Sequence, residues 1–96
     1  MVDRNQIKNS IVTVAQEFSI KKADLFGSYA TERHNENSDV DLLIEFMTPV
    51  VSLLKISGLK HRLEEMMGIP VDILHAPISK EALITIEEVI PLYEAQ

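Results

Sequence analysis

The segment Val40–Phe46, VDLLIEF, constrains the fold of this chain more than any other stretch. It combines β-branched, aliphatic and aromatic residues with little polar interruption, which is typical of a buried β-strand. Two aspartates stand at its start, because Asp39 precedes the strand and Asp41 is its second residue. We therefore expect a protein with a buried strand and a pair of charged groups where the chain enters that strand.

The rest of the sequence predicts helices and further strands around this one. Apolar residues recur at helical spacing over residues 3–18, with Asp3 as the expected N-cap. The other expected elements are a strand at 22–26, a helical turn at 29–33, a polar turn at 34–38, a helix from Thr48-Pro49 to Met67 ended by Gly68, a strand at 71–74, and a helix from Ser79 through Ile90 that Pro91 ends or kinks. This order predicts an α/β or α+β protein with helices packed on a small sheet. The pattern leaves the strand directions open, and a mixed sheet is as compatible with the short connections as a parallel one.

Length and composition limit the classes of protein to which the chain can belong. Its 96 residues are expected to form a single domain over residues 1–96. The chain has no cysteine and no apolar run near the ~20 residues of a membrane helix, and the polar start MVDRNQIKNS leads us to expect no signal peptide. We therefore expect a cytoplasmic protein that does not bind a membrane. The net charge of −6 argues against direct binding of nucleic acid, which usually requires a basic surface.

Asp39 and Asp41 form the first candidate site. Residues i and i+2 of a strand point to the same face, so their Cα atoms lie roughly 6.6 Å apart on one side of the sheet. Two carboxylates this close repel each other, and a divalent cation removes the repulsion. Oxygen-only ligands suit Mg²⁺ or Mn²⁺. The alternative is ordinary turn chemistry, because aspartate beside serine is common at the start of a strand.

Gly27-Ser28 forms the second candidate site, directly after the strand expected at 22–26. Glycine allows the backbone to approach a phosphate closely, serine offers a hydroxyl and an N–H, and a helix that starts there adds its positive end. Tyr29 follows, either to stack on a base or to pack in the core. Asp72, at the start of the next strand, is either a third carboxylate of the cluster or a half-exposed strand residue. Facing the other two aspartates, it could accept a proton or help to hold a second metal ion.

The motif Gly27-Ser28, followed ten residues later by Asp39-Val40-Asp41, resembles the signature of the DNA polymerase β-like nucleotidyltransferase superfamily. The wider pattern LFGSYA…NSDVDLLIEF…VDIL resembles the minimal nucleotidyltransferases, or MNT proteins, which consist of little more than the catalytic core. The resemblance implies an α/β core with a small mixed sheet that binds ATP with Mg²⁺ in a two-metal site. It assigns triphosphate binding to Gly27 and Ser28, metal binding to Asp39, Asp41 and Asp72, and catalysis to the same three aspartates.

The resemblance also implies a partner. Proteins of this kind often pair with a HEPN-domain toxin, and some transfer AMP from ATP to a tyrosine of that toxin. The leading interpretation is therefore an enzyme, a protein adenylyltransferase that acts as an antitoxin in a hetero-oligomer with the HEPN protein. One alternative is an antitoxin that neutralises its toxin by binding alone. Transfer to a small molecule is a third alternative, ranked lower because we expect no second domain that would form a pocket for the acceptor.

The chain departs from the family pattern at Thr31 and Glu32, where the family commonly has a basic residue and then a glycine. A glutamate directed toward a triphosphate is unfavourable. Arg33, the next residue, is the candidate to supply the missing positive charge in nucleotide binding. This departure favours the antitoxin that acts by binding alone, whereas the intact Asp39, Asp41 and Asp72 favour the enzyme.

Overall fold

The computed structural model of the chain describes residues 2–35, 37–76 and 88–95. In chain order, the elements in these ranges are α1 (Arg4–Val14), β1 (Ile20–Phe26), α2 (Ser28–Thr31), β2 (Val40–Phe46), α3 (Leu53–Met67), β3 (Val71–His75) and β4 (Ile90–Glu94). The central strand β2 has the bounds expected from the sequence. Over the described ranges, no helix has both the length and the apolar character required to cross a membrane.

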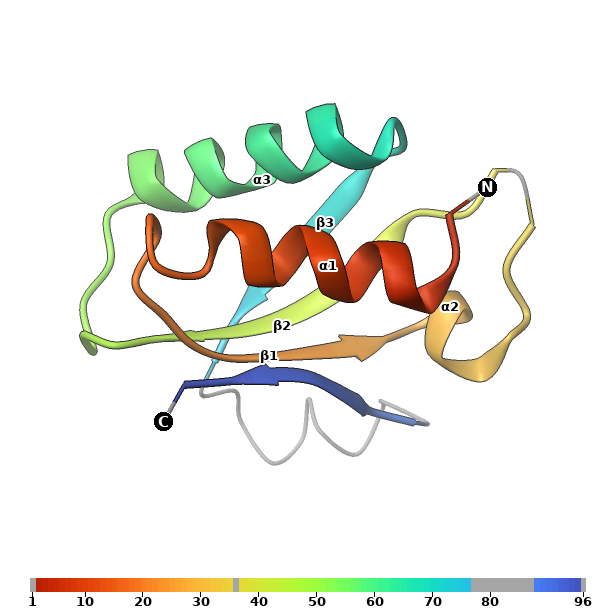
Figure 1. The fold of residues 1–96 in the computed structure, drawn as a ribbon, viewed down its shortest axis with the longest axis horizontal. Helices are drawn as coiled ribbons and strands as arrows, with labels where there is room; N and C mark the ends of the chain where they lie inside the picture. The colour runs from red at the N-terminus through yellow and green to blue at the C-terminus, as the bar shows by residue number, and fades with distance from the viewer. Residues whose placement is uncertain (1, 36, 77–87, 96) are drawn as a thin grey trace.

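The four strands form one mixed sheet in the order β3-β2-β1-β4. β1 is antiparallel to both of its neighbours, β2 and β4, whereas β2 and β3 run parallel. Figure 1 shows α1 and α3 over the same side of the sheet and α2 beyond the end of β1. The predicted fold class, an α/β protein with helices packed on a small mixed sheet, is confirmed.

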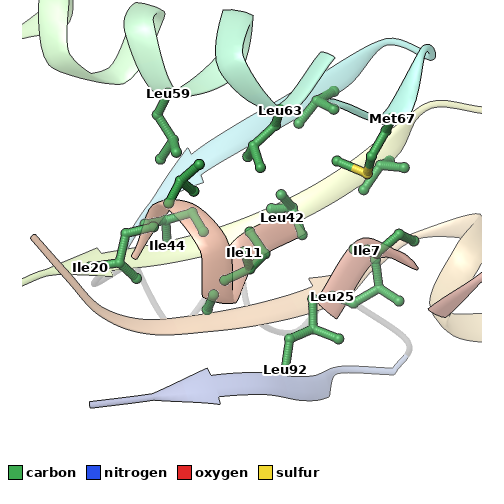
Figure 2. Packing of buried hydrophobic residues seen from close by; sticks show 14 of the residues in the cluster. Ile7, Ile11, Ile20, Leu25, Leu42, Ile44, Leu59, Leu63, Met67 and Leu92 are labelled. Carbon is green, nitrogen blue, oxygen red and sulfur yellow. The ribbon is translucent and has the colours of Figure 1, made fainter. Parts of the chain in front are cut away.

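Alternation along β2 separates a core face from a second face, which points away from α1 and α3 and is called the distal face below. The buried residues of the strand are Val40, Leu42, Ile44 and Phe46, and the partly exposed ones between them are Asp41, Leu43 and Glu45. In Figure 2, Ile7 and Ile11 of α1 and Leu59 and Leu63 of α3 surround Leu42 and Ile44. Each fully buried aliphatic side chain contributes about 1.5–3 kcal/mol to stability. The core thus fixes which side of β2 carries the aspartate.

Helix α1 begins where the sequence predicts but ends earlier. Asp3 is the N-cap, since its carboxylate accepts a hydrogen bond of 2.8 Å from the N–H of Gln6, whose side chain accepts one of 2.9 Å from the N–H of Asp3. This reciprocal pair is a capping box. The helix stops at Val14 rather than Phe18, and the chain turns through Ser19, whose φ of 54° lies in the left-handed region. The turn reverses the chain so that β1 can start at Ile20.

Helix α3 begins four residues later than the Thr48-Pro49 cap predicted from the sequence. Ser52 is the N-cap, and its hydroxyl accepts a hydrogen bond of 3.1 Å from the N–H of Lys55. The hydroxyl of Thr48 instead donates to the carbonyl of Val50, so it does not cap a helix. Gly68 ends the helix as predicted, with φ of 73° and its N–H bonded to the carbonyl of Glu64 at 2.7 Å.

The C-terminal prediction is wrong where it can be compared with the structure. Residues 77–87, which include Ser79 and most of the expected last helix, lie outside the described residues. Val89 is not helical, and Ile90 begins the strand β4, which the sequence analysis missed. Pro91 lies within this strand and pairs with Asp24 of β1. Because β4 is at the edge of the sheet, a proline without an N–H is tolerated there.

Candidate active site

The sheet brings two of the three predicted carboxylates, Asp41 and Asp72, side by side on the distal face, and Asp39 lies just before β2. Asp41 is the second residue of β2, and Asp39 precedes the strand, close enough for its negative charge to act on Asp41. Asp72 of β3 is the direct partner of Asp41 in the parallel register. Adjacent strands lie about 4.8 Å apart, so the two side chains project from neighbouring points of one surface. Asp72 therefore belongs to the cluster.

The electrostatic environment of Asp41 is set by burial and by the neighbouring carboxylates. The pKa of Asp41 is raised above the usual value of 3.8, first by burial and then by the negative charges of Asp72 and Asp39. A raised carboxyl pKa means that the charged form is disfavoured in the folded protein. A positive charge beside Asp41 would offset the repulsion from Asp72 and Asp39 and so favour the charged form.

The turn at Gly27 packs directly against this cluster. Gly27 has φ of 77° and ψ of −155°, a conformation that is essentially limited to glycine. A Cβ built on Gly27 would collide with the carboxylate of Asp41, so glycine is required here for space as well. Phe26, the residue before it, pairs with Asp41 across β1 and β2. The predicted phosphate-binding turn and the predicted metal-binding carboxylates are therefore adjacent.

Ser28 begins α2, which is a single turn of helix. A helix this short has a weak dipole, so the interaction of a phosphate with this turn would rest on the Ser28 hydroxyl and nearby backbone N–H groups rather than on a helix end. Arg33 follows the other end of α2, and its N–H donates to the carbonyl of Ser28 at 2.9 Å. The structure thus places Gly27 against the carboxylate of Asp41, with Ser28 as the next residue and Arg33 about one helical turn further along.

Glu32, the residue that departs from the family pattern, has φ of 63°. This left-handed conformation is the one in which glycine is favoured, which gives a physical reason for the usual family glycine at this position. The Glu32 carboxylate lies 3.5 Å from a guanidinium nitrogen of Arg4 in α1. Its negative charge is therefore paired with an arginine of the helix layer.

Tyr29 packs in the core, which decides between the two interpretations of this residue. Its side chain is 1% exposed, and its ring stacks on His34 with the ring centroids 4.2 Å apart and the planes 8° from parallel. A ring enclosed in this way has no free face for a nucleotide base.

Asp24 of β1 is a distal-face carboxylate that the sequence analysis missed. It pairs with Leu43 of β2, two residues from the Phe26–Asp41 pair. Its side chain is 8% exposed and lies 3.9 Å from the ammonium group of Lys22. Burial, more than any other factor, raises its pKa above 3.8, and its Oδ1 is buried without a hydrogen-bond partner. The sequence signal was its place two residues before Phe26, which puts both on one face of the strand.

The residues of the cluster fit a divalent cation in their chemistry. All three are carboxylates, and hard oxygen ligands are what Mg²⁺ prefers. Among residues 2–35, 37–76 and 88–95, no three acidic, histidine or cysteine side chains already converge as a complete metal centre. Mg²⁺ does not require one, because it is usually bound by one or two carboxylates together with substrate phosphates and water.

Comparisons with known proteins agree with this geometry. The family model described as a nucleotidyltransferase domain matches residues 7–92. A protein of Methanocaldococcus jannaschii, provisionally named a protein adenylyltransferase, is 43% identical over 70 residues, which cover 73% of this chain and 74% of the relative.

Solved structures show the same fold. The structure of a protein described provisionally as a minimal nucleotidyltransferase superposes with a TM-score of 0.77 at 27% identity, covering 95% of this chain and 97% of the other. An MNT antitoxin, solved in complex with a tri-AMPylated HEPN toxin of Shewanella oneidensis, gives a TM-score of 0.70 at 16% identity, with 96% and 73% of the two chains covered. The resemblance to the minimal nucleotidyltransferases is thereby confirmed, and the chain belongs to the nucleotidyltransferase domain family.

Proposed function

We propose that this chain is a Mg²⁺-dependent protein adenylyltransferase that transfers AMP from ATP to a tyrosine of a HEPN-domain toxin and acts as its antitoxin. The observation that carries the proposal is the contact between the Gly27 turn and the Asp41 carboxylate, with Asp72 in register beside Asp41. This arrangement joins a turn suited to phosphate with carboxylates suited to a cation. The names of the relatives support the class of reaction and the kind of partner.

In the proposed reaction, the tyrosine hydroxyl attacks the α-phosphorus of ATP. A bond forms between the tyrosine oxygen and the α-phosphorus, the bond from that phosphorus to the bridging oxygen breaks, and pyrophosphate leaves with the electron pair. The proton of the hydroxyl moves to a carboxylate oxygen, for which Asp72 is assigned because it is the exposed member of the cluster. AMP is thereby transferred without an oxidant or a reductant.

The residues of the chain have distinct tasks in this reaction. Gly27 and Ser28 hold the triphosphate, and Arg33 adds a positive charge at the far end of α2. Asp39 and Asp41, with Asp72 for a second ion, hold Mg²⁺. When bound, Mg²⁺ neutralises phosphate charge and aligns the attacking and leaving oxygens.

Intact-mass spectrometry tests the proposal. The full chain is incubated with Mg-ATP and the HEPN-domain protein encoded beside it, and the mass of that protein is measured. We expect an increase of one or more AMP units, located on tyrosine by peptide mapping, and no increase with Asp39→Asn combined with Asp41→Asn. Glu65→Gln, which removes an exposed charge from α3, is the control and should remain active.

Two results would contradict the proposal. Modification by the double variant would show that the two aspartates are not the metal ligands. No modification by the unaltered chain, combined with a tight complex that silences the HEPN protein, would show that the chain neutralises its partner by binding alone.

A further inference from the structure

The first turn of α1 holds the C-terminal end of α2 through one side chain, that of Arg4. One of its guanidinium nitrogens, Nη2, donates to the carbonyl of Ala30 at 2.7 Å, and Nε donates to the carbonyl of Tyr29 at 3.4 Å. Nη2 also lies 3.5 Å from a carboxylate oxygen of Glu32. One side chain, 25 or more residues distant in sequence, thus contacts three parts of the end of α2.

The helix α2 needs an external support of this kind. The last carbonyls of any helix lack partners within the helix, and a helix of a single turn is not stable by itself in water. The N–H groups of Glu32 and Arg33 both bond to the carbonyl of Ser28. The carbonyls of Tyr29 and Ala30 are bonded by Arg4 instead, and the planar fork of arginine suits several acceptors at once.

The other end of α2 is fixed by the distal face of the sheet. Gly27, the N-cap of α2, packs so closely on Asp41 that no Cβ fits between them. The position of the Gly27-Ser28 turn relative to the carboxylates is therefore set at one end by Asp41 and at the other by Arg4. Release of the Arg4 end would let α2 turn about its contact with Asp41.

We infer that Arg4 is a positioning residue of the nucleotide site: it holds α2 so that Gly27 and Ser28 face the carboxylates in the geometry that the triphosphate requires. The inference rests on the proposed function, in which this turn binds ATP. Arg4 does not touch the reacting atoms in this scheme, and it acts through α2.

The surroundings of Arg4 allow its effect on the site to be separated from an effect on folding. Its side chain is 40% exposed and borders a cavity of about 520 Å³, which Asp3, Asn5, Tyr29, Glu32 and His34 also line. A substitution there leaves no void in the main core. Lys8 gives a matched control because it is an exposed cation on the same helix, one turn further along.

The test compares Arg4→Lys, Arg4→Met and Lys8→Met in the full chain with its HEPN partner. Three kinds of quantity are measured: the KM for Mg-ATP and the kcat of AMP transfer, the melting temperature, and the hydrogen exchange of the α2 amides of Ala30, Thr31 and Arg33. These amides donate to the carbonyls of Gly27 and Ser28, so they report on α2 itself. The exchange measurement does not require activity.

We expect Arg4→Met to raise the KM for ATP about tenfold, as loss of one charge-assisted hydrogen bond would. The α2 amides should exchange faster in this variant and kcat should change little, while loss of the bonds to Tyr29 and Ala30 should lower the melting temperature by a few degrees, at most about 10 °C. In Arg4→Lys, the rise in KM and the faster exchange should both be smaller than in Arg4→Met, because lysine keeps the positive charge but lacks the forked guanidinium group. Lys8→Met should match the unaltered protein.

Each other outcome contradicts a specific statement. Unchanged KM and unchanged exchange in Arg4→Met would overturn the inference, as would a lower melting temperature with an unchanged KM, which would indicate a structural role alone. Faster α2 exchange in a protein that never binds ATP would support the contact of Arg4 with α2 and overturn the proposed function instead.

Discussion

Replacing Asp41 with asparagine should stabilise the protein in the absence of metal. Asp41 carries a charge that is disfavoured by burial and by its neighbours Asp72 and Asp39. At a carboxylate separation of about 5 Å, set by the strand spacing, the repulsion from Asp72 is ~0.8 kcal/mol in water and ~3 kcal/mol at an effective dielectric constant of about 20. Because Asp72 is exposed to solvent, which screens its charge, the repulsion of ~0.8 kcal/mol for water applies. Asp39, roughly 6.6 Å away, adds about 0.6 kcal/mol, so the total is about 1.4 kcal/mol, which corresponds to about 6–11 °C in melting temperature.

The measurement is thermal unfolding with a chelator at neutral pH and low salt. The gain of Asp41→Asn should decrease at high salt, because screening weakens the repulsion. The gain should also decrease as the pH is lowered. The folded protein binds a proton at Asp41 more readily than the unfolded chain does, because the pKa of Asp41 is raised on folding. The charge of Asp41 therefore destabilises the folded protein above this raised pKa, and the destabilisation is lost as the pH falls toward 3.8. Glu65→Gln controls for the general effect of reducing the net charge.

A melting temperature equal to or below that of the unaltered protein, at neutral pH and low salt, would refute the reasoning. So would a gain that Glu65→Gln reproduces in full, because the effect would then belong to the net charge of −6 and not to the cluster. Addition of Mg²⁺ gives a further check, since it should stabilise the unaltered protein more than Asp41→Asn.

The other predictions concern stability. Gly27→Ala should lower the free energy of unfolding by about 2 kcal/mol or more in urea denaturation, because both its φ and the nearby carboxylate oppose a Cβ, whereas Gly68→Ala, with nothing within 4 Å, should cost only about 1 kcal/mol. Asp24→Asn should raise the melting temperature at neutral pH, and the gain should disappear toward pH 3.8, because burial raises the pKa of Asp24; a gain independent of pH would contradict this. Leu63→Ala should cost about 2–5 kcal/mol in urea, since it opens a cavity in the core, and a loss below about 1 kcal/mol would show that the core relaxes around the substituted residue.

Local signals in the sequence predicted most of the fold. The errors occurred where two local signals competed, or where pairing with a segment distant in sequence determined the secondary structure. Thr48-Pro49 and Ser52 both offer capping chemistry, and only the geometry of the chain after β2 selects Ser52. The sequence assigns Ile90 to a helix, because this residue continues an apolar pattern of helical spacing, and Pro91 is expected to end that helix. Pairing with β1 instead makes both residues part of a strand. A five-residue edge strand that contains proline has no distinct pattern of its own.

The sequence predicted those features of the candidate site that depend only on residues close together in the chain. The prediction that Asp39 and Asp41 lie close together depends only on the alternation of side chains along a β-strand, whatever the rest of the fold. The position of Asp72 beside Asp41 depends on the register of β2 against β3, which the sequence does not reveal. The contact of Arg4 with Ala30 spans 26 residues and depends on how α1 crosses the sheet, so no local pattern could indicate it.

The alternation along β2 also has a consequence for how the protein tolerates change. Val40, Leu42 and Ile44 are buried in the core beneath the helices, whereas Asp41 lies on the distal face, against the Gly27 turn. This strand thus interleaves core positions and distal-face positions residue by residue. Substitution of core-facing residues in the helices leaves the distal face in place, and substitution on the distal face leaves the core in place; Arg4 of α1, which bonds to α2, is the exception. A mutational scan scored once for abundance and once for AMP transfer should divide this strand with a period of two.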